Sequence, residues 1–373
     1  MIVAGEVSGD MHAARLVRQL RARDPSLVFF GIGGERMREA GVETRYDVSS
    51  MAVAGLTEVI RKLPLFRRAF FDLLEQARQR RPRAAILVDY PGFNIRLAER
   101  VHRLRVKTIY YICPQVWAWN RRRIPRIAAA VDRMITIFPF EPALFAGTGL
   151  RAEFVGHPAV DIVKEEMALP PVDLPWPGEP RVALLPGSRD HEIEKILPVV
   201  WRAAGLLEQK IPGAGFIIAT PSAETERMIR ATLRRAGPGP ARWQIVTGQT
   251  RQVLRQARAA MVASGTATLE ASLLLCPMVV VYRLSTLSYL CGKLLVKVPH
   301  IALVNIVAGK EVCPELIQTA ASPAALCRHL EPLLEDGPER QRMLQDLQAV
   351  NAALGEGGAE RRAAEIVFQA IGS

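Results

Sequence analysis

The sequence predicts an α/β protein built from two Rossmann-like domains that face one another across a cleft. Three observations predict this fold class. The chain has 373 residues, short apolar β-like runs alternate with helical stretches in both halves, and a proline-rich stretch lies between the halves. A chain of this length exceeds one ordinary hydrophobic core, so two domains are expected. Repeated strand–helix alternation is typical of parallel, doubly wound sheets.

The first half contains a series of expected strands, each followed by a turn or a helical pattern. A short strand at residues 2–4 leads into the glycine-rich turn 5–10, which starts a helix at about 11–23. Further strands are expected at residues 28–31, 84–88, 108–112 and 134–137. We therefore expect an N-terminal domain over residues 1–165, with ligands at the carboxyl ends of its strands.

A linker is expected at residues 166–180, where prolines are concentrated. Beyond it the alternation resumes, which defines a second domain over residues 181–340 with strands at 182–185, 216–219, 244–246, 259–262 and 278–282. The Ala- and Arg-rich stretch 341–373 is expected to be helical and to pack back on the first domain.

Composition limits the possible partners and compartments. The formal net charge of +12 favours anionic partners such as nucleic acid, an acidic membrane surface or phosphorylated substrates. The five cysteines are scattered, which indicates reduced thiols in a cytosol-like compartment rather than disulfides or a zinc site. Polar residues and a proline interrupt the most apolar stretch, 259–282, so we expect no transmembrane span, and we expect no signal peptide.

Two short segments in the second half are candidates for binding a nucleotide-sugar. The first, 184–189, places Gly187, Ser188 and Arg189 on a strand-to-helix turn. Free backbone N–H groups and the helix dipole at such a turn attract phosphate, and Arg189 adds a fork of donors for a diphosphate.

The second segment, 264–270, has a similar position after an apolar run. Gly265 and Thr266 open a helical pattern, and Glu270 follows about one turn later, where its carboxylate is suited to the diol of a ribose. Together the two segments predict a UDP-sugar ligand. The alternative is that each is an ordinary turn.

Eight stretches that run in order along nearly the whole chain resemble the lipid A disaccharide synthase family of bacterial glycosyltransferases. They are residues 4–10, 88–94, 114–119, 138–141, 155–158, 184–189, 264–270 and 305–318.

The resemblance implies a glycosyltransferase-B fold and an inverting transfer. The 2,3-diacylglucosamine of a UDP donor moves to the 6-hydroxyl of 2,3-diacylglucosamine 1-phosphate, and UDP leaves. Enzymes of this fold usually need neither metal nor cofactor, because helix ends and basic side chains neutralise the diphosphate. The implied location is peripheral, on the cytoplasmic face of the bacterial inner membrane.

Asp89 is the candidate general base. It ends the apolar run 84–88, so its carboxylate is expected at the carboxyl end of a strand, and the matching residue of the family is implicated in catalysis. The alternative is that Asp89 only caps the following loop. Many relatives have a second Asp where this chain has Gly92, which leaves Asp89 without that acid.

Further candidates for binding the nucleotide-sugar come from both ends of the chain. Ser8 lies on the N-terminal glycine-rich turn together with Glu6 and Asp10, although Ser8 and Asp10 are equally suited to be helix caps. Asn305, Glu315 and Gln318 match the family's C-terminal nucleotide-side motif, and the spacing of the last two predicts one face of a helix. His12 and His157 are weaker candidates.

Two aromatic and basic segments are candidates for the acceptor and the membrane. In residues 63–74 an apolar stripe is flanked by basic residues, as in helices that lie in a membrane interface, although such a stripe also describes a core face. The second segment, residues 117–123, contains two tryptophans followed by three arginines. The candidate residues are Phe66, Arg67, Arg68, Phe70, Phe71, Trp117, Trp119, Arg121, Arg122 and Arg123.

Two other functions are compatible with parts of the sequence. Nucleotide-sugar 2-epimerases share the two-domain fold and a UDP site, but their soluble sugars need no segment like 63–74. A nucleic-acid-binding protein would account for the charge, but the positive residues are dispersed and no recognised nucleic-acid motif is present, so we expect no nucleic-acid partner.

Overall fold

The computed structural model describes residues 1–51, 56–284 and 298–372, and it divides them into two compact units. One unit comprises Met1–Pro158 together with Glu356–Ser373, and the other comprises Ala159–Gly355. The sequence predicted a linker at residues 166–180 and a C-terminal segment from residue 341, whereas the two units divide after Pro158 and after Gly355.

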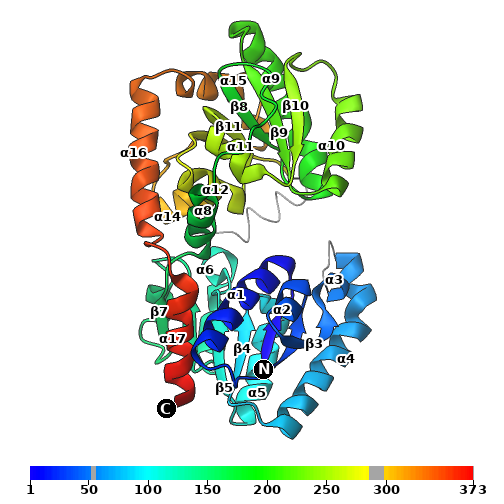
Figure 1. Ribbon diagram of the computed structural model, residues 1–373, viewed down its shortest axis with the longest axis vertical. Coiled ribbons are helices and arrows are strands. Elements are labelled where there is room, and N and C mark those ends of the chain that lie inside the picture. Colours follow the sequence, from blue (N-terminus) through cyan, green and yellow to red (C-terminus); the bar gives the residue numbers. More distant parts are fainter. Residues whose placement is uncertain (52–55, 285–297, 373) are drawn as a thin grey trace. The chain divides into compact units, whose positions relative to one another are not determined.

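The first unit contains a seven-stranded parallel sheet in the order β3-β2-β1-β4-β5-β6-β7. Figure 1 labels four of these strands, β3, β4, β5 and β7. The strands of this sheet consist largely of buried apolar residues, as expected for a parallel sheet covered on both faces. The strands are β1 (Ile2–Ala4), β2 (Phe29–Gly33), β3 (Val42–Asp47), β4 (Ala84–Val88), β5 (Lys107–Tyr111), β6 (Arg133–Thr136) and β7 (Arg151–Phe154). Two of them, β3 and β7, were not predicted, because polar residues interrupt their apolar pattern.

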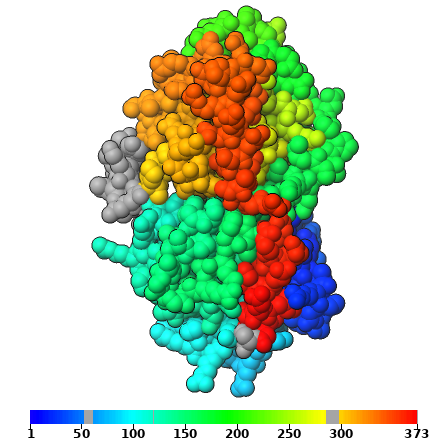
Figure 2. Space-filling view, turned by 90° about the vertical axis from the view of Figure 1, so that its left-hand side faces the viewer, coloured from blue at the N-terminus to red at the C-terminus, as the bar shows by residue number. Residues whose placement is uncertain are grey.

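Helices follow most of these strands. They are α1 (Val7–Arg23), α2 (Glu35–Glu39), α3 (Val48–Met51), α4 (Leu56–Arg80), α5 (Pro91–Arg103), α6 (Val116–Trp119), α7 (Ile124–Ala128) and the C-terminal α17 (Ala359–Gly372). Helix α17 lies beside α1, where Glu360 accepts a 2.9 Å hydrogen bond from Arg15 and Arg23 lies 4.8 Å from the ring of Phe368 (Figures 1 and 2).

The second unit contains a six-stranded parallel sheet in the order β10-β9-β8-β11-β12-β13. Its strands are β8 (Arg181–Leu185), β9 (Gly215–Thr220), β10 (Trp243–Thr247), β11 (Ala259–Ala263), β12 (Met278–Tyr282) and β13 (Glu315–Ile317). Its helices are α8 (Pro158–Ala168), α9 (Asp190–Lys210), α10 (Ala223–Ala236), α11 (Thr250–Gln256), α12 (Thr266–Leu273), α14 (Leu303–Ala308), α15 (Pro323–Leu330) and α16 (Pro338–Ala353). The predicted fold class, two parallel-sheet α/β domains, is confirmed.

The strand order identifies one favoured ligand position in each sheet. In the first sheet the order reverses between β1 and β4, and in the second it reverses between β8 and β11. Ligands of doubly wound sheets bind outside the carboxyl ends of the two strands at such a reversal. Ligand-binding residues are therefore expected in the segments that follow β1, β4, β8 and β11.

Candidate active site

Asp89 directly follows β4, at the reversal point of the first sheet, and its backbone is fixed. Its φ of 45° lies in the left-handed region, which costs a non-glycine residue about 1–3 kcal/mol. Its carbonyl oxygen accepts hydrogen bonds from the Tyr110 hydroxyl at 2.6 Å and from Asn94 Nδ2 at 2.8 Å. Its N–H donates to Tyr111 O at 3.0 Å. These contacts maintain a strained conformation, which is typical of a functional position.

Burial, together with the negative charge of Glu6, raises the pKa of Asp89 to about 6. The N–H of Tyr90 opposes this shift by bonding the carboxylate. Glu6 follows β1, so the two acids come from the two strands at the reversal point. A carboxylate with a pKa near 6 is ionised at neutral pH and is a stronger base than an ordinary Asp.

Glu141, the last residue of the stretch 138–141, is a buried acid that follows β6 on the same edge of the sheet. Its Oε2 accepts hydrogen bonds from the N–H groups of Ile137 and Phe138 at 3.2 and 3.0 Å, and its Oε1 accepts one from Trp117 Nε1 at 3.3 Å. Burial raises its pKa to about 7, and the charge of Asp89 contributes to the rise.

Both weaker histidine candidates are neutral, and His157 is buried whereas His12 is partly buried. Burial lowers the pKa of His12 to about 4 and that of His157 to about 3, with the charge of Arg15 and the proximity of the two histidines as further causes. The ring of His157 packs 5.2 Å from that of Phe138. Neither histidine has the protonation range of a catalytic acid.

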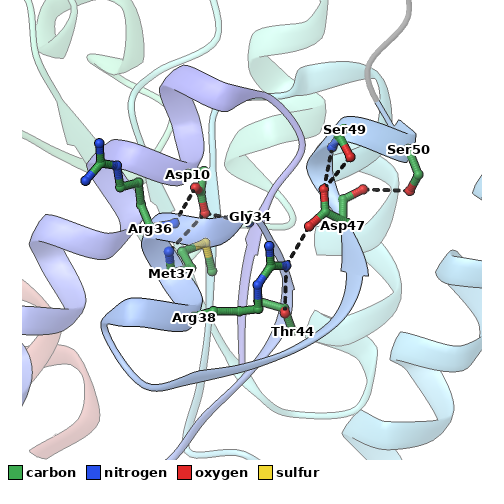
Figure 3. Close-up of polar contacts among 9 residues, drawn as sticks. All are labelled: Asp10, Gly34, Arg36, Met37, Arg38, Thr44, Asp47, Ser49 and Ser50. Atoms are coloured by element: carbon green, nitrogen blue, oxygen red, sulfur yellow. Dashed lines mark hydrogen bonds and ion pairs between the residues drawn. The ribbon is translucent and has the colours of Figure 1, made fainter.

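Asp10 has a structural contact and caps a helix other than its own. Its carboxylate accepts the N–H groups of Gly34, Arg36 and Met37 at 2.6, 3.1 and 3.2 Å, at the start of α2 (Figure 3). The carboxylate of Asp47, at the end of β3, accepts hydrogen bonds from the N–H and the hydroxyl of Ser49 at 2.9 and 2.6 Å (Figure 3). Ser8, in contrast, is exposed in the first turn of α1, next to the carboxyl end of β1.

In the second unit, the turn after β8 differs in one respect from the prediction. The N–H groups of Ser188 and Arg189 donate to Glu192 Oε2 at 3.1 and 3.3 Å, so the expectation of free N–H groups at these two residues is wrong. The side chain of Glu192 folds back over the turn, and a Cβ on Gly187 would lie 2.5 Å from its carboxylate. The Arg189 side chain remains 73% exposed and pairs with Glu192 at 3.3 Å.

The turn after β11 matches the prediction more closely. Gly265 precedes α12, and a Cβ built on it would meet no atom within 4 Å, so the backbone faces open space. Thr266 begins the helix, and Glu270 lies one turn later. Glu270 Oε1 accepts a 3.1 Å hydrogen bond from Arg251 of α11.

Asn305 and Glu315 are occupied by contacts within the fold. Asn305 is fully buried, donates to Cys313 O and to Glu315 Oε1, both at 2.8 Å, and accepts from the N–H groups of Val312 and Cys313. Glu315 also accepts the N–H groups of Ile301 and Ala302 before α14. The prediction that Asn305 contacts a ligand directly is therefore wrong, because its amide atoms are all bonded internally.

The predicted helix containing Glu315 and Gln318 is also wrong. Glu315 lies on β13, and Gln318 follows that strand with a φ of 52°. Gln318 Oε1 accepts the N–H of Leu284 at 3.0 Å, and Gln318 Nε2 donates to Leu284 O at 3.4 Å, so this side chain joins the ends of β12 and β13.

The apolar stripe of residues 63–74 belongs mainly to the core. Leu73 and Leu74 are buried, and Phe66 and Phe70 pack against the core of the first unit, which corrects their assignment to a membrane surface. Phe71 is 56% exposed, and Arg67 lies 5.8 Å from its ring. Leu63, Arg67, Arg68 and Phe71 form an exposed surface of α4, which we call the α4 face.

The second aromatic segment is divided in the same way. Trp117 is 5% exposed and donates to Glu141, so its assignment to the acceptor or membrane surface is wrong. The side chain of Trp119 lies outside the described residues. Arg121 and Arg122 are exposed. Arg123 is half-buried, and its positive charge partly opposes the rise in the pKa of Tyr110 that burial causes.

The described residues contain neither a membrane-spanning helix nor a cluster of metal ligands. No helix in this part of the chain is long and apolar enough to cross a membrane. No group of three or more His, Cys, Asp or Glu side chains, among the same residues, is placed to hold a metal ion.

Comparison with known proteins gives a consistent result over the whole chain. A family model described as Lipid-A-disaccharide synthetase matches residues 1–371. The lipid-A-disaccharide synthase of Anaeromyxobacter sp. (strain K) is 42% identical over 378 residues, which cover 99% of this chain and 96% of that protein.

Solved structures that resemble this one share its fold at low sequence identity. A putative UDP-N-acetylglucosamine 2-epimerase from Listeria monocytogenes has a TM-score of 0.66 and 14% identity, with 99% of this chain and 95% of that chain covered. The UDP-GlcNAc 2-epimerase of Methanocaldococcus jannaschii, solved with UDP-GlcNAc and UDP, has a TM-score of 0.65 and 10% identity, with 99% of each chain covered.

Proposed function

Because the chain belongs to the lipid-A-disaccharide synthase family, and is therefore a glycosyltransferase of lipid A biosynthesis, we propose substrates and residue roles for its reaction. The donor is UDP-2,3-diacylglucosamine, and the acceptor is 2,3-diacylglucosamine 1-phosphate. The acceptor's 6-hydroxyl oxygen forms a bond to the anomeric carbon of the donor while the bond from that carbon to the diphosphate breaks. The hydroxyl proton goes to Asp89, UDP leaves with the bonding electron pair, and the anomeric configuration inverts.

The main support for this proposal is the environment of Asp89. Its main chain is fixed by Tyr110 and Asn94, and its pKa of about 6 results from burial and from Glu6. A hydroxyl that attacks at neutral pH needs a base that is ionised but not weakened by a strong ion pair. Gly92, in the first turn of α5, has no carboxylate to assist Asp89, although a Cβ there would meet no atom within 4 Å.

For the nucleotide we propose residues of the second unit. Arg189 provides an exposed guanidinium for the diphosphate, and Glu270 provides a carboxylate for the ribose. Gly187, Ser188, Gly265 and Thr266 form the backbone of the two turns at the reversal point of this sheet. The M. jannaschii enzyme, solved with UDP, has the same fold and so supports a UDP donor. Family membership does not favour the epimerase reaction.

For the lipid side we propose contact with the cytoplasmic face of the inner membrane. The α4 face combines the exposed aromatic ring of Phe71 with Arg67 and Arg68, a pairing suited to anionic headgroups and acyl chains. The exposed guanidinium groups of Arg121 and Arg122 are suited to the acceptor's 1-phosphate or to lipid headgroups.

A substrate assay tests this proposal. The purified chain is incubated in detergent with both proposed substrates, and the products are resolved by thin-layer chromatography and mass spectrometry. We expect a disaccharide 1-phosphate and one equivalent of UDP, with a β-1′,6 linkage by NMR. A folded protein that binds UDP but forms no disaccharide would contradict the acceptor.

A further inference from the structure

Arg251 of α11 lies between two carboxylates of the second unit. Its Nη1 donates to Glu270 Oε1 at 3.1 Å, and its Nε donates to Glu166 Oε2 at 3.3 Å. Glu166 belongs to α8 and Glu270 to α12, so one guanidinium joins three helices. The three side chains are 24 to 34% exposed, which leaves them accessible but partly shielded from water.

Glu166 is held by two neighbouring residues of α11. Its Oε1 accepts a 2.7 Å hydrogen bond from Gln252 Nε2, in addition to the bond from Arg251 to Oε2. The guanidinium of Arg251 is planar, so fixing its Nε also fixes the direction of its Nη atoms. Glu166 and Gln252 thereby determine where Arg251 presents its donor to Glu270.

We propose that Arg251 is a positioning residue of the nucleotide site, which holds the Glu270 carboxylate in the orientation that receives the ribose hydroxyls of UDP. This inference rests on the proposed function, which assigns Glu270 to the nucleotide. Arg251 bonds Oε1 of Glu270, and a carboxylate has about four acceptor positions, so accepting capacity remains for a diol. A side chain that is already ordered loses less rotamer entropy when the ligand binds.

The test is the UDP affinity of the full-length chain, measured by isothermal titration calorimetry, with an unfolding temperature for each variant. Arg251→Met is expected to raise the Kd for UDP about tenfold, and Arg251→Lys, which keeps the charge but loses the planar fork, about threefold. The matched control is Arg255→Met. Arg255 lies one turn later on α11 and donates to Leu169 O at 2.9 Å, so its loss is expected to leave the Kd unchanged.

Glu270→Gln separates this inference from the proposed function. If Glu270→Gln binds UDP as tightly as wild type, the assignment of Glu270 to the nucleotide is wrong. If Glu270→Gln binds weakly while folded Arg251→Met stays within about twofold of wild type, only the role of Arg251 is wrong.

A double variant tests whether the two residues act together. Arg251→Met combined with Glu270→Gln is expected to bind UDP no more weakly than Glu270→Gln alone, because Arg251 acts through Glu270. Losses that multiply would overturn the inference. If Arg251→Met is not recovered folded, Arg251→Lys decides, and a wild-type Kd for it would overturn the inference.

Discussion

The Tyr110 hydroxyl donates a 2.6 Å hydrogen bond to the main-chain oxygen of Asp89, at the point where the backbone turns into the left-handed region. Tyr110 belongs to the neighbouring strand β5 and is fully buried. The bond therefore connects the sheet directly to the residue that we propose as the base. Removing this bond is therefore expected to shift Asp89 while its carboxylate is retained.

Tyr110→Phe removes this hydrogen bond and keeps the ring. We expect kcat to fall about tenfold with little change in KM, because Asp89 is less well placed for proton transfer. We also expect a loss of about 1–2 kcal/mol in unfolding free energy. Tyr46→Phe on β3 of the same sheet is the control, and an unchanged kcat for Tyr110→Phe would show that the bond has no part in catalysis.

The raised pKa of Asp89 predicts how stability changes with pH. Its folded pKa of about 6 exceeds the ordinary value of 3.8, so its contribution to stability is complete below pH 3.8 and is lost as pH rises through 6. Asp89→Asn avoids this loss. The difference in unfolding free energy between Asp89→Asn and wild type should therefore shift in favour of the variant by about 1–3 kcal/mol from pH 4 to pH 8, as measured by urea denaturation. A difference that does not vary with pH would contradict the assigned pKa.

Glu141→Ala tests the buried acceptor that joins α6 to the loop after β6. The substitution leaves the N–H groups of Ile137, Phe138 and Trp117 without their carboxylate, so we expect a loss of about 2–4 kcal/mol in unfolding free energy. Glu141→Gln keeps one acceptor oxygen and should lie between Ala and wild type. Equal stability of all three proteins would refute the structural role of Glu141.

Phe71 and Leu73 distinguish the exposed side of α4 from its core side. Phe71→Ala should reduce binding to anionic vesicles about three- to tenfold and change unfolding free energy by less than about 0.5 kcal/mol. Leu73→Ala should lower the unfolding free energy by about 2–5 kcal/mol, because Leu73 is fully buried. Vesicle sedimentation and denaturation measure the two effects, and unchanged vesicle binding by Phe71→Ala would count against a membrane role for the α4 face.

Local pattern was sufficient to predict most strands of the two sheets and the position of Asp89. The run 84–88 is continuously apolar and forms β4 with Asp89 at its end, because a buried parallel strand needs no polar alternation. Strand β3 was missed because its sequence, VETRYD, contains charged residues, two of which pair with Asp72 and Arg80 of α4.

Side-chain pairing could not be predicted, because it depends on contacts between residues far apart in the chain. Trp117 meets Glu141 across 24 positions, and Arg251 meets Glu166 across 85. Glu192 is only four residues from Ser188, yet its carboxylate accepts the N–H groups of Ser188 and Arg189, which the turn pattern predicted to be free for a ligand. Asn305 lies in a stretch that resembles the family, but its amide bonds the loop that contains Val312 and Cys313, and a sequence pattern does not distinguish such a contact from ligand binding.

The rate of disaccharide formation by Asp89→Asn, compared with wild type at pH 8, tests the central claim most directly. Asparagine keeps the size of the side chain and removes its basicity. If Asp89 is the base, the rate falls by about a hundredfold or more while the Kd for UDP stays at its wild-type value. A rate within about tenfold of wild type, from protein that is folded and binds UDP, would show that another group accepts the proton.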